Sequence, residues 1–351
     1  MKAVLGLEDG EVITGTGFGV EGICTGELVF STQMAGYMEA LTDPSYAGQV
    51  LMFTYPLIGN YGVDLQNFQS PAVHAEGCVV RELCEKPVRR PGVARYFEAN
   101  GLSGISGVDT RKLTIRTRER GTMRACLIVG DDAGEYAVEQ ARAHPQITEI
   151  DLLPKVSCSE PYRIEGKGKR IAVIDLGIKK NMAISLRRRG ADLYLYPYNA
   201  RPDEIEACRP EALFITNGPG DPVRAKEAIA AVRHFTGQIP VFGICMGNQV
   251  AALALGAETY KMKFGHRGSN QPVRHLDGSI YITTQNHGFA VDGETLPEDC
   301  EVLYRNVNDG TLEGFHSDYL DIITVQFHPE AHGGPLDTEQ PLFDQMYRRI
   351  P

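Results

Sequence analysis

The chain has 351 residues, which is enough for two ordinary domains that each bury a core of their own. Apolar residues make up 42% of it and charged residues 23%, as in globular proteins, and no apolar run reaches the roughly 20 residues needed to cross a bilayer. The formal net charge of −10 argues against binding to nucleic acid or to an anionic membrane surface, because phosphates would repel the protein.

The first residues and the cysteines favour a cytoplasmic location. Glu8, Asp9 and Glu11 interrupt the amino-terminal segment before any long apolar run, so we do not expect a signal peptide. The eight cysteines include no Cys-x-x-Cys pair. In a reducing compartment they are expected to be free thiols, and neither disulfides nor a structural zinc site is predicted.

Residues 1–164 have the pattern of a mixed, β-rich α/β domain. Runs of β-branched residues predict strands at 27–32 and 50–55, and helices are expected at 109–120 and 134–144. The segment Gly15-Thr16-Gly17-Phe18-Gly19 has a glycine spacing seen in phosphate-binding loops. No helix follows it, however, so we interpret it as a turn.

A charged, glycine-bearing stretch at 165–170 predicts a linker to a second domain at 170–351. There, short apolar strands alternate with amphipathic helices: strands are expected at 171–176, 193–198, 212–216 and 239–244, and helices at 178–189, 222–235 and 246–255. This alternation predicts an α/β fold with a parallel sheet covered by helices on both faces. Functional groups in such sheets lie at the carboxyl ends of strands, where the glycine-rich turns 217–220 and 243–247 are expected.

The sharpest local signal surrounds Cys245. A strand runs into this cysteine, a helix starts directly after it, and Gly243 and Gly247 flank it at two residues on either side. Glycines at these positions permit a tight, strained turn. Such a turn exposes the sulfur at a helix N-terminus, where the helix dipole favours a thiolate. The plainer interpretation is a core cysteine at a strand end.

His328 is the best candidate for the base that a nucleophilic thiol requires. An apolar strand ends at this histidine, and Glu330 lies two residues on, where its carboxylate can reach the imidazole and fix its tautomer. The alternatives are a surface histidine at a strand end, or a metal site, since His328, Glu330 and His332 alternate. Pro329 disturbs that alternation and no further ligands cluster nearby, so no metal is expected.

Two further segments carry polar groups and glycines. Asn217-Gly218-Pro219-Gly220 precedes a helix, and its glycines allow a substrate to approach the backbone, where an amide N–H can face a developing oxyanion. Gln285-Asn286-His287-Gly288-Phe289 is interpreted as a glycine-broken turn after a strand at 280–284. We interpret His287 as a structural histidine rather than a catalytic one.

In combination and in this order, these elements resemble the class I (triad-type) glutamine amidotransferase domain over roughly 170–351. The resemblance implies a flavodoxin-like sheet and L-glutamine as substrate. Segments 36–46, 54–62, 106–111 and 261–266 resemble the carbamoyl-phosphate synthase small-chain family, so that the resemblance spans nearly the whole chain.

The resemblance implies that Cys245 is the nucleophile, His328 the base and Glu330 its orienter. The amides of Met246 and Gly218 match the family's oxyanion hole. The positions that match glutamine contacts are Ser45, Gly218, Gly220, Met246, Gln249, Asn286, Gly288 and Phe289. Ser45 would reach in from the first domain. Met246 and Asn248 depart from the commoner leucine and histidine.

The resemblance also implies a partner, a large synthetase subunit in a heterodimer or a higher oligomer. That subunit would combine the ammonia with bicarbonate and ATP into carbamoyl phosphate for arginine and pyrimidine biosynthesis. ATP and the metal ions (Mg or Mn, and K) are expected on the large subunit, and no cofactor is expected in this chain. The competing interpretations are a self-contained cysteine hydrolase and a non-enzymatic assembly subunit.

Overall fold

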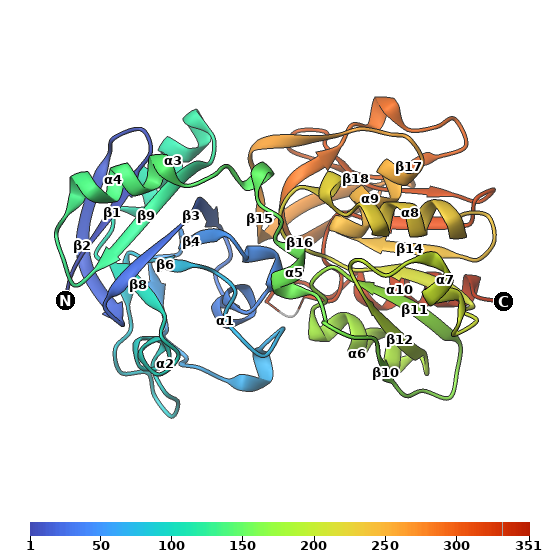
Figure 1. The fold of residues 1–351 in the computed structure, drawn as a ribbon, viewed down its shortest axis with the longest axis horizontal. Coiled ribbons are helices and arrows are strands. Elements are labelled where there is room, and N and C mark those ends of the chain that lie inside the picture. Colours follow the sequence, from blue (N-terminus) through green and yellow to red (C-terminus); the bar gives the residue numbers. More distant parts are fainter. Residues whose placement is uncertain (332) are drawn as a thin grey trace. The chain divides into compact units, whose positions relative to one another are not determined.

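The computed structural model describes residues 1–331 and 333–351. It divides into two compact units, Met1–Ile150 and Asp151–Pro351, each of which is described by itself. Figure 1 shows the fold of each unit along the chain. Within the described residues, no helix combines the length and the apolar character that a membrane span requires.

The first unit is built on a closed barrel with the strand order β1-β2-β8-β6-β4-β3-β9. Its strands are β1 (Lys2–Leu7), β2 (Val12–Gly19), β3 (Gly22–Ser31), β4 (Gln49–Phe53), β6 (Gly77–Val79), β8 (Ser103–Ser106) and β9 (Met123–Val129). Closure leaves no unpaired sheet edge. The expected β-rich first domain is therefore confirmed, and it takes the form of a barrel.

Short helices cover this barrel. They are α1 (Tyr37–Leu41), η1 (Pro44–Tyr46), η2 (Leu65–Asn67), α2 (Val93–Ala99), α3 (Thr110–Arg120), α4 (Gly134–Ala143) and η3 (Ile147–Glu149), and the two-residue strands β5 (Leu57–Ile58) and β7 (Glu82–Leu83) form a separate pair. The small residues Ala137 and Ala141 of α4 pack on Val4 and Ile128 of the barrel. The helices expected at 109–120 and 134–144 are α3 and α4.

The interpretation of Gly15–Gly19 as a turn was wrong, because these residues lie inside β2. A side chain at Gly15 would place its Cβ 2.4 Å from the Ser106 carbonyl oxygen, and one at Gly17 would lie 2.5 Å from the Val129 side chain. The glycines therefore serve the close approach of barrel strands, which has no local signature in the sequence.

The second unit contains a ten-stranded sheet in the order β10-β12-β11-β13-β14-β19-β18-β17-β15-β16. Its strands are β10 (Tyr162–Ile164), β11 (Arg170–Asp175), β12 (Asp192–Pro197), β13 (Ala212–Ile215), β14 (Val241–Ile244), β15 (Thr259–His275), β16 (Ile280–Val291), β17 (Glu301–Asn306), β18 (Leu312–Ser317) and β19 (Ile322–Val325). The five strands β12, β11, β13, β14 and β19 are parallel. The others join the sheet antiparallel, so the sheet is mixed.

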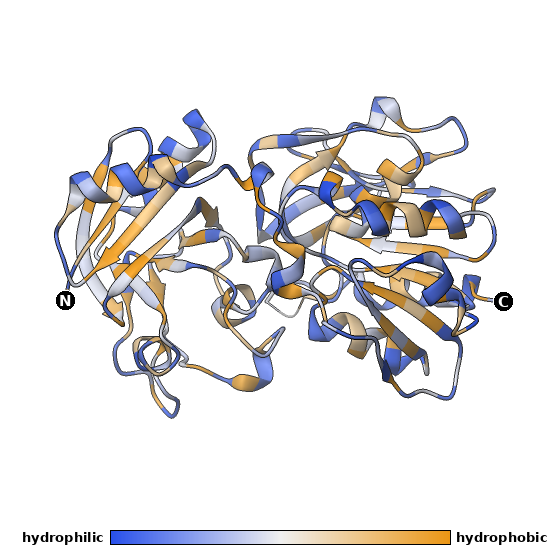
Figure 2. Ribbon diagram, viewed as in Figure 1, coloured by the Kyte–Doolittle hydropathy of each residue, from blue (hydrophilic) through white to orange (hydrophobic). Residues whose placement is uncertain are grey.

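Helices cover both faces of this sheet. They are α5 (Leu153–Val156), α6 (Lys180–Arg188), α7 (Pro202–Glu206), η4 (Pro222–Arg224), α8 (Lys226–Phe235), α9 (Met246–Ala254), η5 (Gly293–Thr295) and α10 (Glu339–Arg349). Ala172 and Ile174 of β11 belong to one core with residues of α8 and α9, whereas Ile171 and Val173 belong to the other with residues of α6 and α10. Two buried faces explain the mostly hydrophobic colours along β11 in Figure 2. The expected α/β class is confirmed.

The single helix expected at 222–235 is interrupted. Asp221 caps η4, with its Oδ1 accepting a hydrogen bond from the amide of Val223, and the regular helix α8 starts only at Lys226. The structure thus places a short 3-10 segment between the turn 217–220 and α8.

Candidate active site

Cys245 lies at the junction between β14 and α9, at the carboxyl edge of the parallel strands. It is 2% exposed, and its amide donates a hydrogen bond to the Val325 carbonyl at 2.8 Å. Its backbone has φ 57° and ψ −105°, a strained conformation for a residue with a side chain. This is the strained strand-to-helix turn that the sequence predicted, with the sulfur at the N-terminus of α9.

Close packing explains the glycines around the cysteine. A Cβ on Gly247 would lie 2.2 Å from the Ile215 carbonyl oxygen, and one on Gly243 would lie 2.5 Å from the Gly247 carbonyl oxygen. Only glycine fits at either position. The first turn of α9 therefore packs directly on the ends of β13 and β14.

His328 and Glu330 follow β19, the strand next to β14. His328 Nδ1 lies 2.9 Å from Glu330 Oε1, and both side chains are fully buried. The His328 amide donates to the Thr284 carbonyl at 2.8 Å, which ties this loop to β16. The predicted contact between the histidine and the carboxylate is therefore present in the structure.

Lys179 was missed by the reasoning from sequence. Its Nζ lies 2.7 Å from Glu330 Oε1, and its side chain is 4% exposed. Its amide also donates to Asn217 Oδ1 at 3.3 Å, which links the loop after β11 to the loop after β13. The signal available in the sequence was its position just after β11, at the carboxyl edge where functional groups of parallel sheets gather.

The charges of this cluster shift the pKa values of its members. Burial and the charge of Lys179 lower the pKa of His328, but the opposing effects of Glu330 and Cys245 outweigh them and raise it to about 9. Burial raises the pKa of Glu330, whereas Lys179 and His328 together lower it to about 2. We infer that His328 is an imidazolium held by the ionised carboxylate of Glu330, because each opposite charge favours the charged form of the other group.

The second ring nitrogen of His328, Nε2, is buried and has no hydrogen-bond partner among the described residues. The Cys245 side chain is close enough to raise the pKa of the imidazole. Sulfur, imidazole and carboxylate therefore form a chain in which a proton can pass between Cys245 and His328.

The glycine turn after β13 lies against the same site. Gly218 is so close to Leu176 and Met246 that an added Cβ would meet the Leu176 carbonyl oxygen at 2.4 Å and the Met246 sulfur at 3.0 Å. Gly220 has φ 83°, which a glycine adopts without strain. The structure thus brings this turn beside the first residue of α9.

The segment Gln285–Phe289 was interpreted wrongly as a turn, because it lies within the continuous strand β16. The Cys245 thiol contacts the Asn286 carbonyl oxygen at 3.5 Å. The side-chain amide Nε2 of Gln249, on α9, donates to the Phe289 carbonyl at 2.8 Å. The segment therefore borders Cys245 through a strand whose partner is bulged, rather than through a loop.

A buried polar network lies behind α9. Asn248 Nδ2 donates to Gln326 Oε1 at 3.1 Å, and Asn248 Oδ1 accepts from the Thr324 hydroxyl at 2.8 Å. Gln249 Nε2 lies 3.1 Å from the same Gln326 oxygen. Asn248, which stands where histidine is commoner, thus connects α9 to β19 and to the residue that follows it.

Ser45 belongs to η1 of the first unit, where its amide donates to Asp43 Oδ1 at 2.9 Å. All eight cysteines are free thiols. His332, which entered the metal interpretation of the His328 segment, lies outside the described residues. Among those residues, one group has the composition of a metal site, His266, His287 and Glu313.

Comparison with known proteins assigns the chain to a family. The profile for class I glutamine amidotransferases matches residues 172–348, and the profile for the CPSase domain of the carbamoyl-phosphate synthase small chain matches residues 5–127. The carbamoyl phosphate synthase small chain of Methanosarcina mazei is 55% identical, with 99% of this chain and 98% of the relative covered. That of Archaeoglobus fulgidus is 48% identical over 96% of each chain, and that of Methanocaldococcus jannaschii is 47% identical over 99% of each.

Proposed function

The chain belongs to the carbamoyl-phosphate synthase small-chain family, whose members are the glutamine-hydrolysing subunits of that enzyme, and we propose that Cys245, His328 and Glu330 carry out the hydrolysis. The observation that supports this assignment most strongly is the buried chain from the strained cysteine through His328 to Glu330 and Lys179. No other described cysteine has a positive φ.

In the first step, the Cys245 thiolate attacks the carboxamide carbon of L-glutamine. The carbonyl oxygen becomes an oxyanion, which the backbone amides of Met246 and Gly218 stabilise, each donor being worth roughly 3–4 kcal/mol of barrier. The His328 imidazolium gives its proton to the amide nitrogen, the carbon–nitrogen bond breaks, and ammonia leaves a γ-glutamyl thioester behind.

In the second step, water attacks the thioester and neutral His328 takes its proton. The carbon–sulfur bond breaks, glutamate is released, and the thiolate faces an imidazolium again. Glu330 holds Nδ1 of the imidazole through both steps, and Lys179 keeps Glu330 ionised, since its ammonium group lowers the pKa of that carboxylate.

The positions assigned to glutamine follow from the resemblance to the family. We assign residues 1–164 to a small-chain domain that includes Ser45, and residues 170–351 to an amidotransferase domain, although the compact units divide earlier, after Ile150. The positions assigned to glutamine in the latter are Gly218, Gly220, Met246, Gln249, Asn286, Gly288 and Phe289. The contact of Gln249 with Phe289 and that of Cys245 with Asn286 support this group.

The small chain implies a large-chain partner. We place ATP, bicarbonate and the Mg, Mn and K ions on that large subunit, in a cytoplasmic heterodimer or higher oligomer that supplies carbamoyl phosphate for arginine and pyrimidine biosynthesis. Ammonia released in bulk water at neutral pH is protonated and lost as a nucleophile, so a sequestered route to the acceptor is expected.

The test is to measure glutamate release from glutamine by the chain alone and with the large subunit, ATP and bicarbonate. We expect slow hydrolysis alone and a strong rise with the partner. Cys245→Ala should abolish glutamate release while the variant still co-elutes with the large subunit and keeps the wild-type melting temperature, which serves as the folding control. Full glutaminase activity of this variant would refute the triad.

The competing interpretations predict different results. Fast hydrolysis that is indifferent to the partner would favour a self-contained hydrolase. No hydrolysis in either condition would favour an assembly subunit.

A further inference from the structure

The strand β15 is irregular where it faces the proposed glutamine contacts. Lys261 pairs with Phe289 and His266 with His287, so four residues of β15, 262–265, lie opposite Gly288 alone. Such a bulge has no regular ladder of backbone hydrogen bonds to fix its shape. Side chains must therefore hold it in place.

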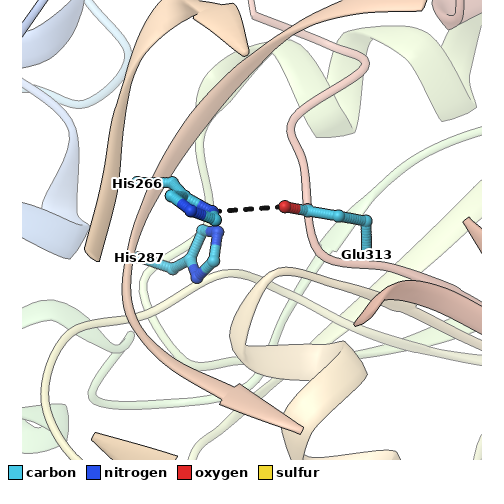
Figure 3. A group of neighbouring side chains, drawn as sticks. All are labelled: His266, His287 and Glu313. Atoms are coloured by element: carbon cyan, nitrogen blue, oxygen red, sulfur yellow. Dashed lines mark ion pairs between the residues drawn. The ribbon is translucent and has the colours of Figure 1, made fainter. Parts of the chain in front are cut away.

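His266 ends the bulge and is clamped between two carboxylates. Its Nε2 lies 2.9 Å from Asp309 Oδ2, and its Nδ1 lies 3.2 Å from Glu313 Oε1. Glu313 is fully buried on β18, and the Asn306 amide also donates to it, at 3.0 Å. Figure 3 shows the ion pair reaching from His266 across to Glu313. The clamp thus fastens the bulge of β15 to β18 and to the loop after β17.

Arg267 holds the same bulge from within. It is 3% exposed, and its Nη1 donates to the carbonyl oxygen of Phe264 at 2.7 Å. Its guanidinium also lies against Gly288, since a Cβ there would come within 2.9 Å of Nη2. Arg267 therefore links the interior of the bulge to the glycine opposite it.

His287, the residue paired with His266, joins this cluster to the substrate segment. The two imidazole rings meet edge to face, with centroids 5.0 Å apart and planes at 88° (Figure 3). His287 Nδ1 lies 2.9 Å from the Phe289 carbonyl oxygen, which also accepts a hydrogen bond from the side-chain amide of Gln249. A displacement of His266 would therefore pass through His287 to Phe289.

His266, His287 and Glu313 also have the composition of a metal site, but their donor atoms have other partners. Both ring nitrogens of His266 face carboxylate oxygens, and those of His287 face the Phe289 carbonyl and Gln285 Oε1. Burial lowers the pKa of His266, but the hydrogen bonds to Asp309 and Glu313 outweigh it and raise the pKa to about 9. His266 is therefore an imidazolium at neutral pH, and an imidazolium has no lone pair for a metal.

We infer that His266 is a positioning residue for glutamine: clamped by Asp309 and Glu313, it holds the bulge 262–265 so that Gly288 and Phe289 keep the place that the substrate requires. This inference rests on the proposed function. His266 touches no reacting atom, so its loss should weaken glutamine binding far more than it slows the chemical step.

The experiment compares His266→Gln and His266→Ala with the matched control His316→Gln in the complex with the large subunit. His316 lies on β18 and pairs with Glu301 at 3.1 Å, as His266 pairs with Glu313, but it is only partly buried and its partner is exposed. The readouts are kcat and KM for glutamine, and carbamoyl phosphate synthesis from ammonia. We expect KM to rise at least tenfold in His266→Ala and less in His266→Gln, with kcat within threefold of wild type and the control unchanged.

Unchanged KM in both His266 variants would overturn the inference, as would a fall in kcat without a change in KM. If His266→Ala does not fold, as judged by the loss of its cooperative thermal unfolding transition, His266→Gln decides, because its amide can still bond one carboxylate. One equivalent of tightly bound zinc in the wild-type protein would also overturn the inference, because His266, His287 and Glu313 would then be metal ligands. The Cys245→Ala variant is run in parallel: if it retains glutaminase activity, the proposed function fails and not the clamp.

Discussion

Gly247→Ala tests whether the geometry of the nucleophile turn controls catalysis. The added Cβ would lie 2.2 Å from the Ile215 carbonyl oxygen, whereas real Cβ contacts essentially never fall below 3.0 Å. The first turn of α9 and the end of β13 must therefore separate by at least about 0.8 Å. Both are backbone, so no flexible side chain can yield in their place.

This displacement moves the Met246 amide and the Cys245 backbone together, since both belong to the turn that leads into α9. A misplacement of about 1 Å at a reacting centre can cost roughly 10²-fold in rate. We therefore expect kcat for glutamine hydrolysis to fall about 10²-fold, and the protein to lose about 1–3 kcal/mol of stability from overpacking.

The assay is glutamate release by the complex with the large subunit, together with thermal unfolding followed by circular dichroism. The matched control is Gly293→Ala in the same unit, where an added Cβ would meet its nearest neighbour, Leu312, at an ordinary 3.4 Å. A kcat for Gly247→Ala within threefold of wild type, at unchanged stability, would refute the reasoning that close packing fixes the turn.

Three further outcomes follow from buried polar groups. Lys179→Met removes one of the two cationic partners of the fully buried Glu330. The free energy of unfolding, measured by urea titration, should fall by about 3–5 kcal/mol, and a fall below about 1 kcal/mol would contradict the buried ion pair. The raised pKa of His266, about 9 against 6.5 for a free histidine, stabilises the fold fully below pH 6.5, and this contribution should disappear as the pH rises through 9. Melting temperatures measured across this range should fall less in His266→Gln than in wild type, and equal slopes would count against the clamp. Asn248→Leu removes one hydrogen-bond partner each from the buried Thr324 and Gln326 and should lower the free energy of unfolding by about 1–3 kcal/mol, unlike Asn308→Leu in the exposed loop before β18.

Some features of the site can be predicted from the sequence because their causes are local. Glycines two residues before and after Cys245 indicate a tight turn, and a carboxylate two residues after His328 is within reach of its imidazole whatever the rest of the chain does. The alternation of strands and helices between 171 and 255 likewise reports local periodicity, since one buried face per helix and two per strand leave different patterns.

Other features depend on contacts between distant segments. Lys179 and Glu330 are 151 positions apart, and nothing near the lysine indicates that its ammonium group meets that carboxylate. Gly15 and Gly17 resemble turn residues until the barrel places Ser106 and Val129 against them. Gln285–Phe289 resembles a broken turn for the same reason, because its glycine and polar residues are accommodated by a bulge in the partner strand.

The sequence by itself therefore determined the class of the fold, the strained cysteine turn and the pairing of His328 with Glu330, since short-range geometry dictates each of these. Only the tertiary structure decided that half of the second sheet is antiparallel, that Lys179 completes the buried charge cluster, and that His266 fastens β15 beneath the proposed glutamine contacts. These features arise where strands far apart in the chain become neighbours, and the burial that makes their charges matter exists only once the whole sheet has formed.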